Sequence, residues 1–130
     1  MDKISLMQLL EENRLNNVEE INYKDDIVIF RFTYEYDEDE KKAAKAYTED
    51  ECDSTDEDVI REEFYIPYLM DIAVDNVGDI IEEAMDEFEL QGQFISFDID
   101  EDLNGNEFIA MFYSKDEDYE IDEVLDNLNI

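Results

Sequence analysis

The sequence contains no histidine, no tryptophan, one cysteine, one proline and three glycines. The absence of histidine removes the side chain that most often serves as an acid–base catalyst or metal ligand. The single cysteine, Cys52, cannot form an internal disulfide bond, and it has no histidine to activate it as a nucleophile. With so few glycines, the chain also lacks a glycine-rich loop that would bind phosphates. We therefore expect a protein that is not an enzyme and that resides in a reducing compartment.

Basic residues are scarce, with 9 Lys and Arg against 41 Asp and Glu, and the net charge is −32. A small domain needs a net charge of only roughly 2–8 to stay soluble, so solubility alone does not explain the excess. A protein this acidic is repelled by nucleic acids and anionic membranes and is attracted to basic proteins. We expect a basic protein partner, with no direct binding to nucleic acid or membrane. Adaptation to salt, or acidity that is merely tolerated, is the alternative.

Long apolar runs are missing as well. No apolar stretch is long enough for a transmembrane helix, and no apolar segment follows Met1 as it would in a secretory signal. The apolar fraction of 44% is nevertheless sufficient for a folded core. We expect a single cytoplasmic domain over residues 1–130, as a monomer or homodimer. Ile, Asn, Lys, Tyr and Phe are the amino acids of AT-rich codons, and their presence indicates a low-GC bacterium or its phage.

The apolar spacing predicts three helices. Leucines three and four residues apart indicate a short helix over 5–13, and a similar pattern indicates another over 119–128. Between them, 68–90 carries apolar residues at every third or fourth position, which predicts a long amphipathic helix. Gly92 is expected to end that helix.

Three segments are expected to form strands. Residues 27–36 alternate between two faces and are rich in aromatic and β-branched residues, which is the standard strand pattern. Residues 94–100 and 107–114 are predicted to form a hairpin around Asn104 and Gly105. Residues 16–17 are expected to link the first helix to the first strand.

Two segments have weaker patterns. Residues 37–58 are dominated by acids and are interpreted as a mobile acidic loop with one helical turn at most. Residues 59–66 suit a strand, which we favour, or a helix kinked at Pro67. The predicted fold class is α+β: a small, mostly antiparallel sheet of three to four strands packed against one long and two short helices.

The segment from Asp100 to Gly105 matches the first half of an EF-hand calcium loop, D-x-D-x-N-G. The second half departs from the motif, because Met111 stands where a bidentate acid is required. The flanking segments are also predicted strands, whereas an EF-hand requires helices. We interpret the segment as a hairpin turn and expect no cofactor and no specific metal site; weak cation binding over 100–107 is the alternative.

One face of the long predicted helix carries only acids, spaced three or four residues apart opposite the apolar stripe. We call this set the acidic ridge: Asp71, Asp75, Asp79, Glu82, Asp86 and Glu89. Glu83 and Glu87 flank it, and no Lys or Arg occurs between Arg61 and Lys115. Like charges four residues apart destabilise a helix by about 0.2–0.5 kcal/mol per pair. A helix selected only for solubility normally mixes both signs, so the pattern favours an anionic surface for a basic partner.

The ridge invites comparison with DNA, which carries one phosphate per ~3.4 Å along each strand. In its small size, strong acidity and shortage of histidine and glycine, the chain resembles the DNA-mimic inhibitors made by phages and mobile elements. These include anti-restriction proteins, anti-CRISPR proteins and uracil-DNA glycosylase inhibitors. The resemblance implies an inhibitor whose carboxylates stand in for phosphates, but no signature residue aligns with any one family.

We therefore predict an acidic DNA-mimic-type inhibitor that binds the basic nucleic-acid-binding surface of another protein. The expected partner-binding residues are Asp71, Asp75, Asp79, Glu82, Glu83, Asp86, Glu87, Glu89, Asp98, Asp100 and Asp102. An immunity or antitoxin-like protein that neutralises a basic nuclease is one alternative. An acidic housekeeping domain with weak cation binding is another.

Overall fold

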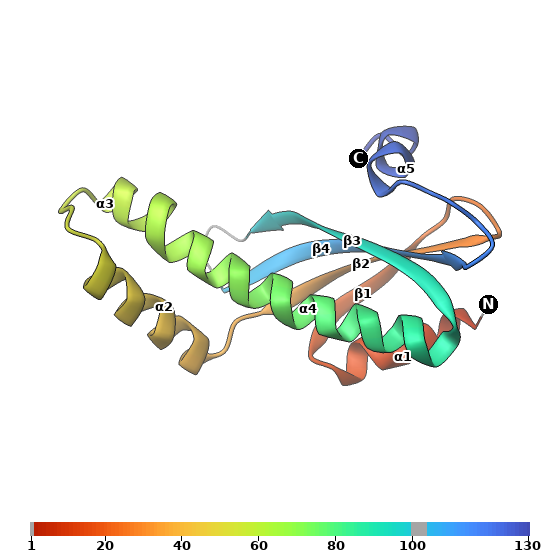
Figure 1. The fold of residues 1–130 in the computed structure, drawn as a ribbon, viewed down its shortest axis with the longest axis horizontal. Helices are drawn as coiled ribbons and strands as arrows, with labels where there is room; N and C mark the ends of the chain where they lie inside the picture. Colours follow the sequence, from red (N-terminus) through yellow and green to blue (C-terminus); the bar gives the residue numbers. More distant parts are fainter. Residues whose placement is uncertain (1, 100–103) are drawn as a thin grey trace.

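The structure, a computed structural model, describes residues 2–99 and 104–130 (Figure 1). Along the chain its elements are α1 (Lys3–Glu12), β1 (Leu15–Ile21), β2 (Ile27–Glu35), α2 (Glu38–Glu51), α3 (Glu57–Val59), the π-helix η1 (Ile60–Tyr65), α4 (Ile66–Phe88), β3 (Leu90–Ile99), β4 (Gly105–Ser114) and α5 (Ile121–Asn127). The strands form one antiparallel sheet in the order β1-β2-β4-β3. This confirms the predicted α+β class.

The centre of the sheet is made by β2 and β4, which are buried along most of their length. The aromatic face of the predicted strand 27–36 is buried: Val28, Phe30, Phe32 and Tyr34 of β2, with Tyr36 just beyond its end. Register pairs Phe32 with Phe108, and their rings stack with centroids 6.0 Å apart. The alternation of residues in the strand therefore places its aromatic side chains together on one face of the sheet.

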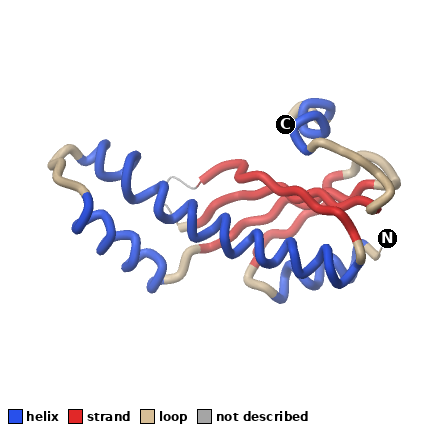
Figure 2. The backbone as a smooth tube through the Cα atoms, in the orientation of Figure 1, coloured by secondary structure: helices blue, strands red, loops and turns tan. Residues whose placement is uncertain are grey.

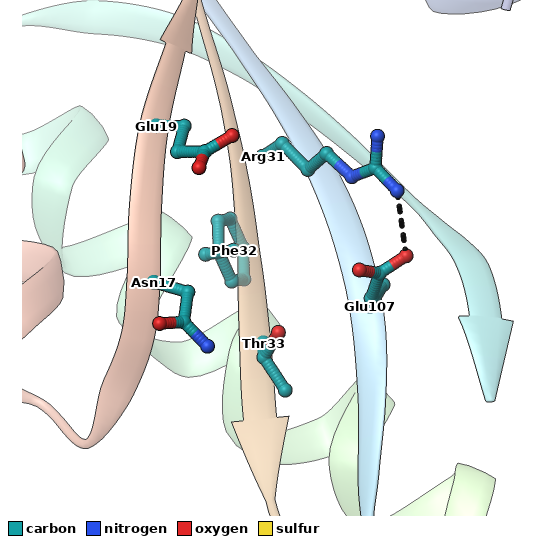
Figure 3. Close-up of a pocket in the computed structure, with 6 residues that line it drawn as sticks. All are labelled: Asn17, Glu19, Arg31, Phe32, Thr33 and Glu107. Carbon is teal, nitrogen blue, oxygen red and sulfur yellow. Dashed lines mark hydrogen bonds and ion pairs between the residues drawn. The ribbon is translucent and has the colours of Figure 1, made fainter. Parts of the chain in front are cut away.

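Helices cover the two faces of this sheet unequally. On one face, α1 and α4 pack against the aromatic residues of β2 and β4, and α4 runs along the length of the sheet (Figure 2). On the other face, α5 packs Ile121 and Val124 against Ile27, Ile29 and Met111. The rest of that face carries polar residues and remains open, with a hollow lined in part by Arg31 and Glu107 (Figure 3).

The expected link at residues 16–17 is instead part of β1. Its apolar residues, Leu15, Val18 and Ile21, are three positions apart because a bulge interrupts the pairing between Asn16 and Glu19. Asn17 adopts a left-handed conformation, with φ of 54°, inside this bulge. An irregular strand loses the period of two on which strand prediction depends.

The prediction of an acidic loop over 37–58 is wrong for the first two thirds of that segment, where the structure has α2. Asp37 and Glu40 form a capping box at the N-terminus of α2, each side chain accepting from the other residue's backbone N–H. Acids in the first turn are also favourable next to the helix dipole, and the alanines that follow have high helix propensity. Ala44 and Thr48 are buried, so α2 rests against the body of the protein.

Residues 59–66 are helical, so the strand that the sequence favoured is wrong and the helical alternative holds. The chain passes from α3 through η1 into α4, and Pro67 lies in the first turn of α4. A π-turn bond from the Ile66 N–H to the Arg61 carbonyl precedes the proline, which has no N–H of its own.

Helix α4 stops before Gly92, contrary to the prediction. Its C-cap is Glu89, which adopts the left-handed conformation with φ of 54°. Gly92 instead pairs with Phe112 in the sheet, where a Cβ would lie 3.1 Å from Met85 Cγ. The glycine therefore permits close approach of β3 to the helix.

Candidate protein-interaction surface

The candidate surface is set by the way α4 is packed. Its inward face is buried, as predicted from the spacing: Leu69, Ala73, Val77, Ile80, Ile81 and Ala84. With 3.6 residues per turn, the residues directly opposite this stripe are those of the acidic ridge. All six acids of the ridge are exposed, as are the flanking Glu83 and Glu87.

The flanking acids extend the negative surface toward α1. Glu83 and Glu87 line a hollow of about 420 Å³ together with Glu12 and Gln8 of α1. Glu12 is itself exposed, so carboxylates from two helices meet at this hollow. The sequence did not suggest this contribution, because the packing of α1 beside α4 is a tertiary feature.

The ion pairs found among residues 2–99 and 104–130 do not involve the ridge. Ion pairs between described residues join Lys3 to Glu20, Arg14 to Asp37 and Glu40, Arg31 to Glu107, and Lys41 to Glu38. None of these pairs includes an acid of the ridge or its flanks. Three of the nine basic residues, Lys41, Lys42 and Lys45, lie on α2. The exposed face of α4 is therefore more negative than the side of the molecule that α2 forms.

Part of the ridge also opposes the dipole of its own helix. Asp86 lies in the last turn of α4 and Glu89 caps it, and that turn contains no basic residue. Negative charge at a helix C-terminus is unfavourable by typically 0.3–1 kcal/mol per charge when exposed. These acids are thus placed where they reduce the stability of the helix.

A polar cluster around Asn76, on the same flank of α4 as Glu83, fixes the helix relative to the sheet. The Tyr34 hydroxyl donates to Glu40 Oε2 at 2.5 Å and accepts from Asn76 Nδ2 at 2.7 Å. Arg14 pairs with Glu40 Oε1 at 3.3 Å. Burial, and then the hydrogen bond to Glu40, raises the pKa of Tyr34 to about 12. The cluster joins β2, α2 and α4, and so holds the ridge in a defined orientation.

The remaining predicted acids follow the hairpin. β3 runs antiparallel to α4, since Gly92 lies near Met85 and Phe94 near Gly78. Asp98 lies near the end of β3, opposite Glu107 in the register. Because β3 runs antiparallel to α4, this end of the strand lies toward Asp71, at the start of the ridge. Asp100 and Asp102 lie outside the described residues.

A second concave region lies on the open part of the sheet. One hollow of about 330 Å³ is lined by Asn17, Glu19, Arg31, Phe32, Thr33 and Glu107 (Figure 3). Arg31 donates to Glu107 at 2.9 Å and lies over the ring of Phe97, 4.8 Å from its centroid. In this region the cation Arg31 is paired with the carboxylate of Glu107, whereas the ion pairs of the described residues include no acid of the ridge. It was not anticipated because it requires β1.

The described residues contain no group of three or more acids or cysteines arranged to hold a metal ion. The turn that resembles half of an EF-hand falls largely within residues 100–103, which the structure does not describe. Over residues 2–99 and 104–130, no helix is long and apolar enough to cross a membrane.

In comparisons with known proteins, no family model matches the chain, and no curated protein or solved structure is significantly similar to it.

Proposed function

We propose that the protein is a DNA-mimic-type inhibitor that occupies the basic nucleic-acid-binding surface of another protein. The observation that supports this proposal is the exposed face of α4, where the acidic ridge and its flanks carry no counter-charge from any described ion pair. The cost to helix stability indicates that these acids serve a purpose other than folding.

The spacing of the charges is compatible with mimicry. From residue 71 to residue 89 an α-helix extends about 27 Å. The eight carboxylates of the ridge and its flanks are therefore on average about 3.9 Å apart along the helix axis, close to the ~3.4 Å between phosphates along one strand of DNA. A rigid helix presents these charges with little loss of conformational entropy on binding.

Binding would follow the physics of protein–DNA association. Lysines and arginines in the partner's groove would contact carboxylates in place of phosphates. Counterions held by both surfaces would be released, so the affinity should fall steeply as the salt concentration rises. Long-range attraction between the two surfaces would also accelerate association at low salt.

The test is capture from the native host. Immobilised full-length protein is incubated with host lysate at low salt, and retained proteins are eluted first with a short DNA duplex and then with salt. We expect a specific nucleic-acid-binding protein in the duplex eluate. A matched column that carries the double variant Asp75→Lys with Glu82→Lys should retain much less of this nucleic-acid-binding protein. Recovery of no protein that the duplex displaces would contradict the proposal.

A further inference from the structure

The outer edge of β3 is unusual for this chain. Residues 90–97 form its longest stretch without a charged residue, eight positions in a sequence that is 38% charged. Edge strands are normally protected from pairing by charges, proline or bulges. The opposite edge, β1, has such protection in Glu19, Glu20 and the bulge at Asn16. In β3 the register is regular from Leu90 to Ser96, and an irregularity follows between Ser96 and Asp98.

No further strand pairs with this edge within the part of the chain that the structure describes. Outside the helices and the sheet, the backbone hydrogen bonds of the described residues include none made by residues 90–97. The contact with α5 is made by a side chain, since Gln93 Oε1 accepts from the Ile121 N–H on one face of the sheet. The backbone groups that point away from β4 are therefore available to another strand.

Helix α4 provides a partly apolar wall beside this edge. Gly78 packs near Phe94, where a Cβ would lie 3.6 Å from the ring. Val74, one turn earlier on the same flank, is 39% exposed, which is unusual on a helix whose other exposed positions are mostly acidic. Around the circumference of α4, Asp71 and Glu82 of the ridge are the next residues after Val74 and Gly78 in the direction away from the sheet.

We infer that the β3 edge binds an extended segment of a partner protein, in which basic and apolar residues alternate, as a fifth strand. Its backbone would pair with β3. Its basic side chains would lie on the α4 side of the sheet, where their aliphatic stems would cross Val74 and Phe94 and their ammonium groups would reach Asp71 and Glu82 of the ridge. Its apolar side chains would lie on the opposite face of the sheet, beside Ile95 and Phe97, which is 39% exposed. A second copy of the chain is a poorer occupant, because each copy brings a net charge of −32 to the same edge. This site goes beyond the proposed function, because it requires an acidic wall but no imitation of DNA.

Amide hydrogen exchange of the full-length protein, measured by NMR, tests this site. The probe is a ten-residue peptide that alternates valine and lysine, and the control peptide has five lysines followed by five valines. With the alternating peptide, every second amide in 90–97 should exchange roughly tenfold more slowly, since those amides gain a strand partner. The control peptide should not produce this pattern.

Two variants of equal charge change locate the effect. Val74→Lys places a cation in the wall and should abolish the protection. Ala46→Lys, at an exposed position on α2, should leave it unchanged. Figure 1 shows α2 and β3 on opposite sides of α4.

Two results would overturn the inference. In one, the peptide perturbs the ridge but leaves the β3 amides unprotected. In the other, the β3 amides become protected in the protein alone as its concentration rises, which would make a second copy the occupant. Either result leaves the capture experiment of the proposed function unaffected, and a failed capture leaves this measurement unaffected.

Discussion

Tyr34 is the residue at which three elements are bonded together, because its buried hydroxyl contacts Glu40 of α2 and Asn76 of α4. Replacing it with phenylalanine removes both contacts while preserving the ring. We expect Tyr34→Phe to lower the free energy of unfolding by about 1–2 kcal/mol, the usual effect of losing buried hydrogen bonds. Urea denaturation near neutral pH measures this loss.

The same substitution has a pH signature. The pKa of Tyr34 is raised from its ordinary value of 10.0 to about 12 in the folded protein. Its contribution to stability is therefore complete below pH 10 and is lost as the pH rises through about 12. The stability gap between the wild type and Tyr34→Phe should narrow across this range. An unchanged gap would show that the hydroxyl does not titrate with folding.

Glu89 has two features that destabilise the folded state. Its φ of 54° is strained for a residue with a side chain, and its charge lies at the C-terminus of α4. We expect Glu89→Gly to raise the free energy of unfolding by about 1 kcal/mol, because glycine relieves the strain and removes the charge. The control Glu83→Gly, more than one turn before the end of α4, removes the same charge and should lower it by about 1 kcal/mol. Urea midpoints of the two variants should thus move in opposite directions.

At the scale of elements, the like charges of the ridge are expected to lower the stability of α4. Asp75 and Glu82 each have ridge acids three or four residues away on both sides. Changing both to lysine converts four like-charge pairs, 71/75, 75/79, 79/82 and 82/86, into opposite-charge pairs. We expect the free energy of unfolding to rise by about 1–2 kcal/mol at low salt. A decrease would mean that these acids have stabilising contacts in solution that the structure does not show.

The elements also differ in how well the sequence predicts them. β2 and α4 follow from regular periods of two and of three to four, because each buries one complete face. β1 could not be found in this way, since its bulge shifts Leu15, Val18 and Ile21 to a spacing of three. α2 could have been found from the capping box of Asp37 and Glu40, but its acidic composition suggested a loop instead.

The candidate surface, too, is predictable from the sequence only in part. Exposure of the acidic ridge follows from the buried stripe of α4, because a helix that buries one face exposes the opposite one. Glu12, by contrast, joins the surface through the packing of α1, which no local pattern reports. The wall beside β3 likewise depends on where Gly78 of α4 meets Phe94 of the strand.

For the whole molecule, the net charge of −32 implies self-repulsion in the folded state. Raising NaCl from about 0.1 M to about 1 M shortens the Debye length from about 10 Å to about 3 Å. We expect the urea midpoint to rise over this range. The midpoint should rise less for the double variant Asp75→Lys with Glu82→Lys, because its net charge is less negative. An equal rise for the wild type and the double variant would mean that salt acts by strengthening apolar burial and not by screening charge.

The central claim is that the carboxylates of α4 compete with DNA for a basic surface. It is tested most directly by displacement of a labelled duplex from the protein captured in the host experiment. The three competitors are the wild type, Asp75→Lys with Glu82→Lys, and the control pair Asp50→Lys with Asp53→Lys, which makes the same charge change at exposed positions near the end of α2.

We expect the wild type and the control pair to displace the duplex at similar concentrations. The ridge variant should need at least roughly tenfold more protein, although we expect its fold to be the more stable one, because the partner's cations would now meet two lysines. Displacement by the ridge variant at the wild-type concentration would contradict the account, since the ridge would then not be the surface that replaces DNA.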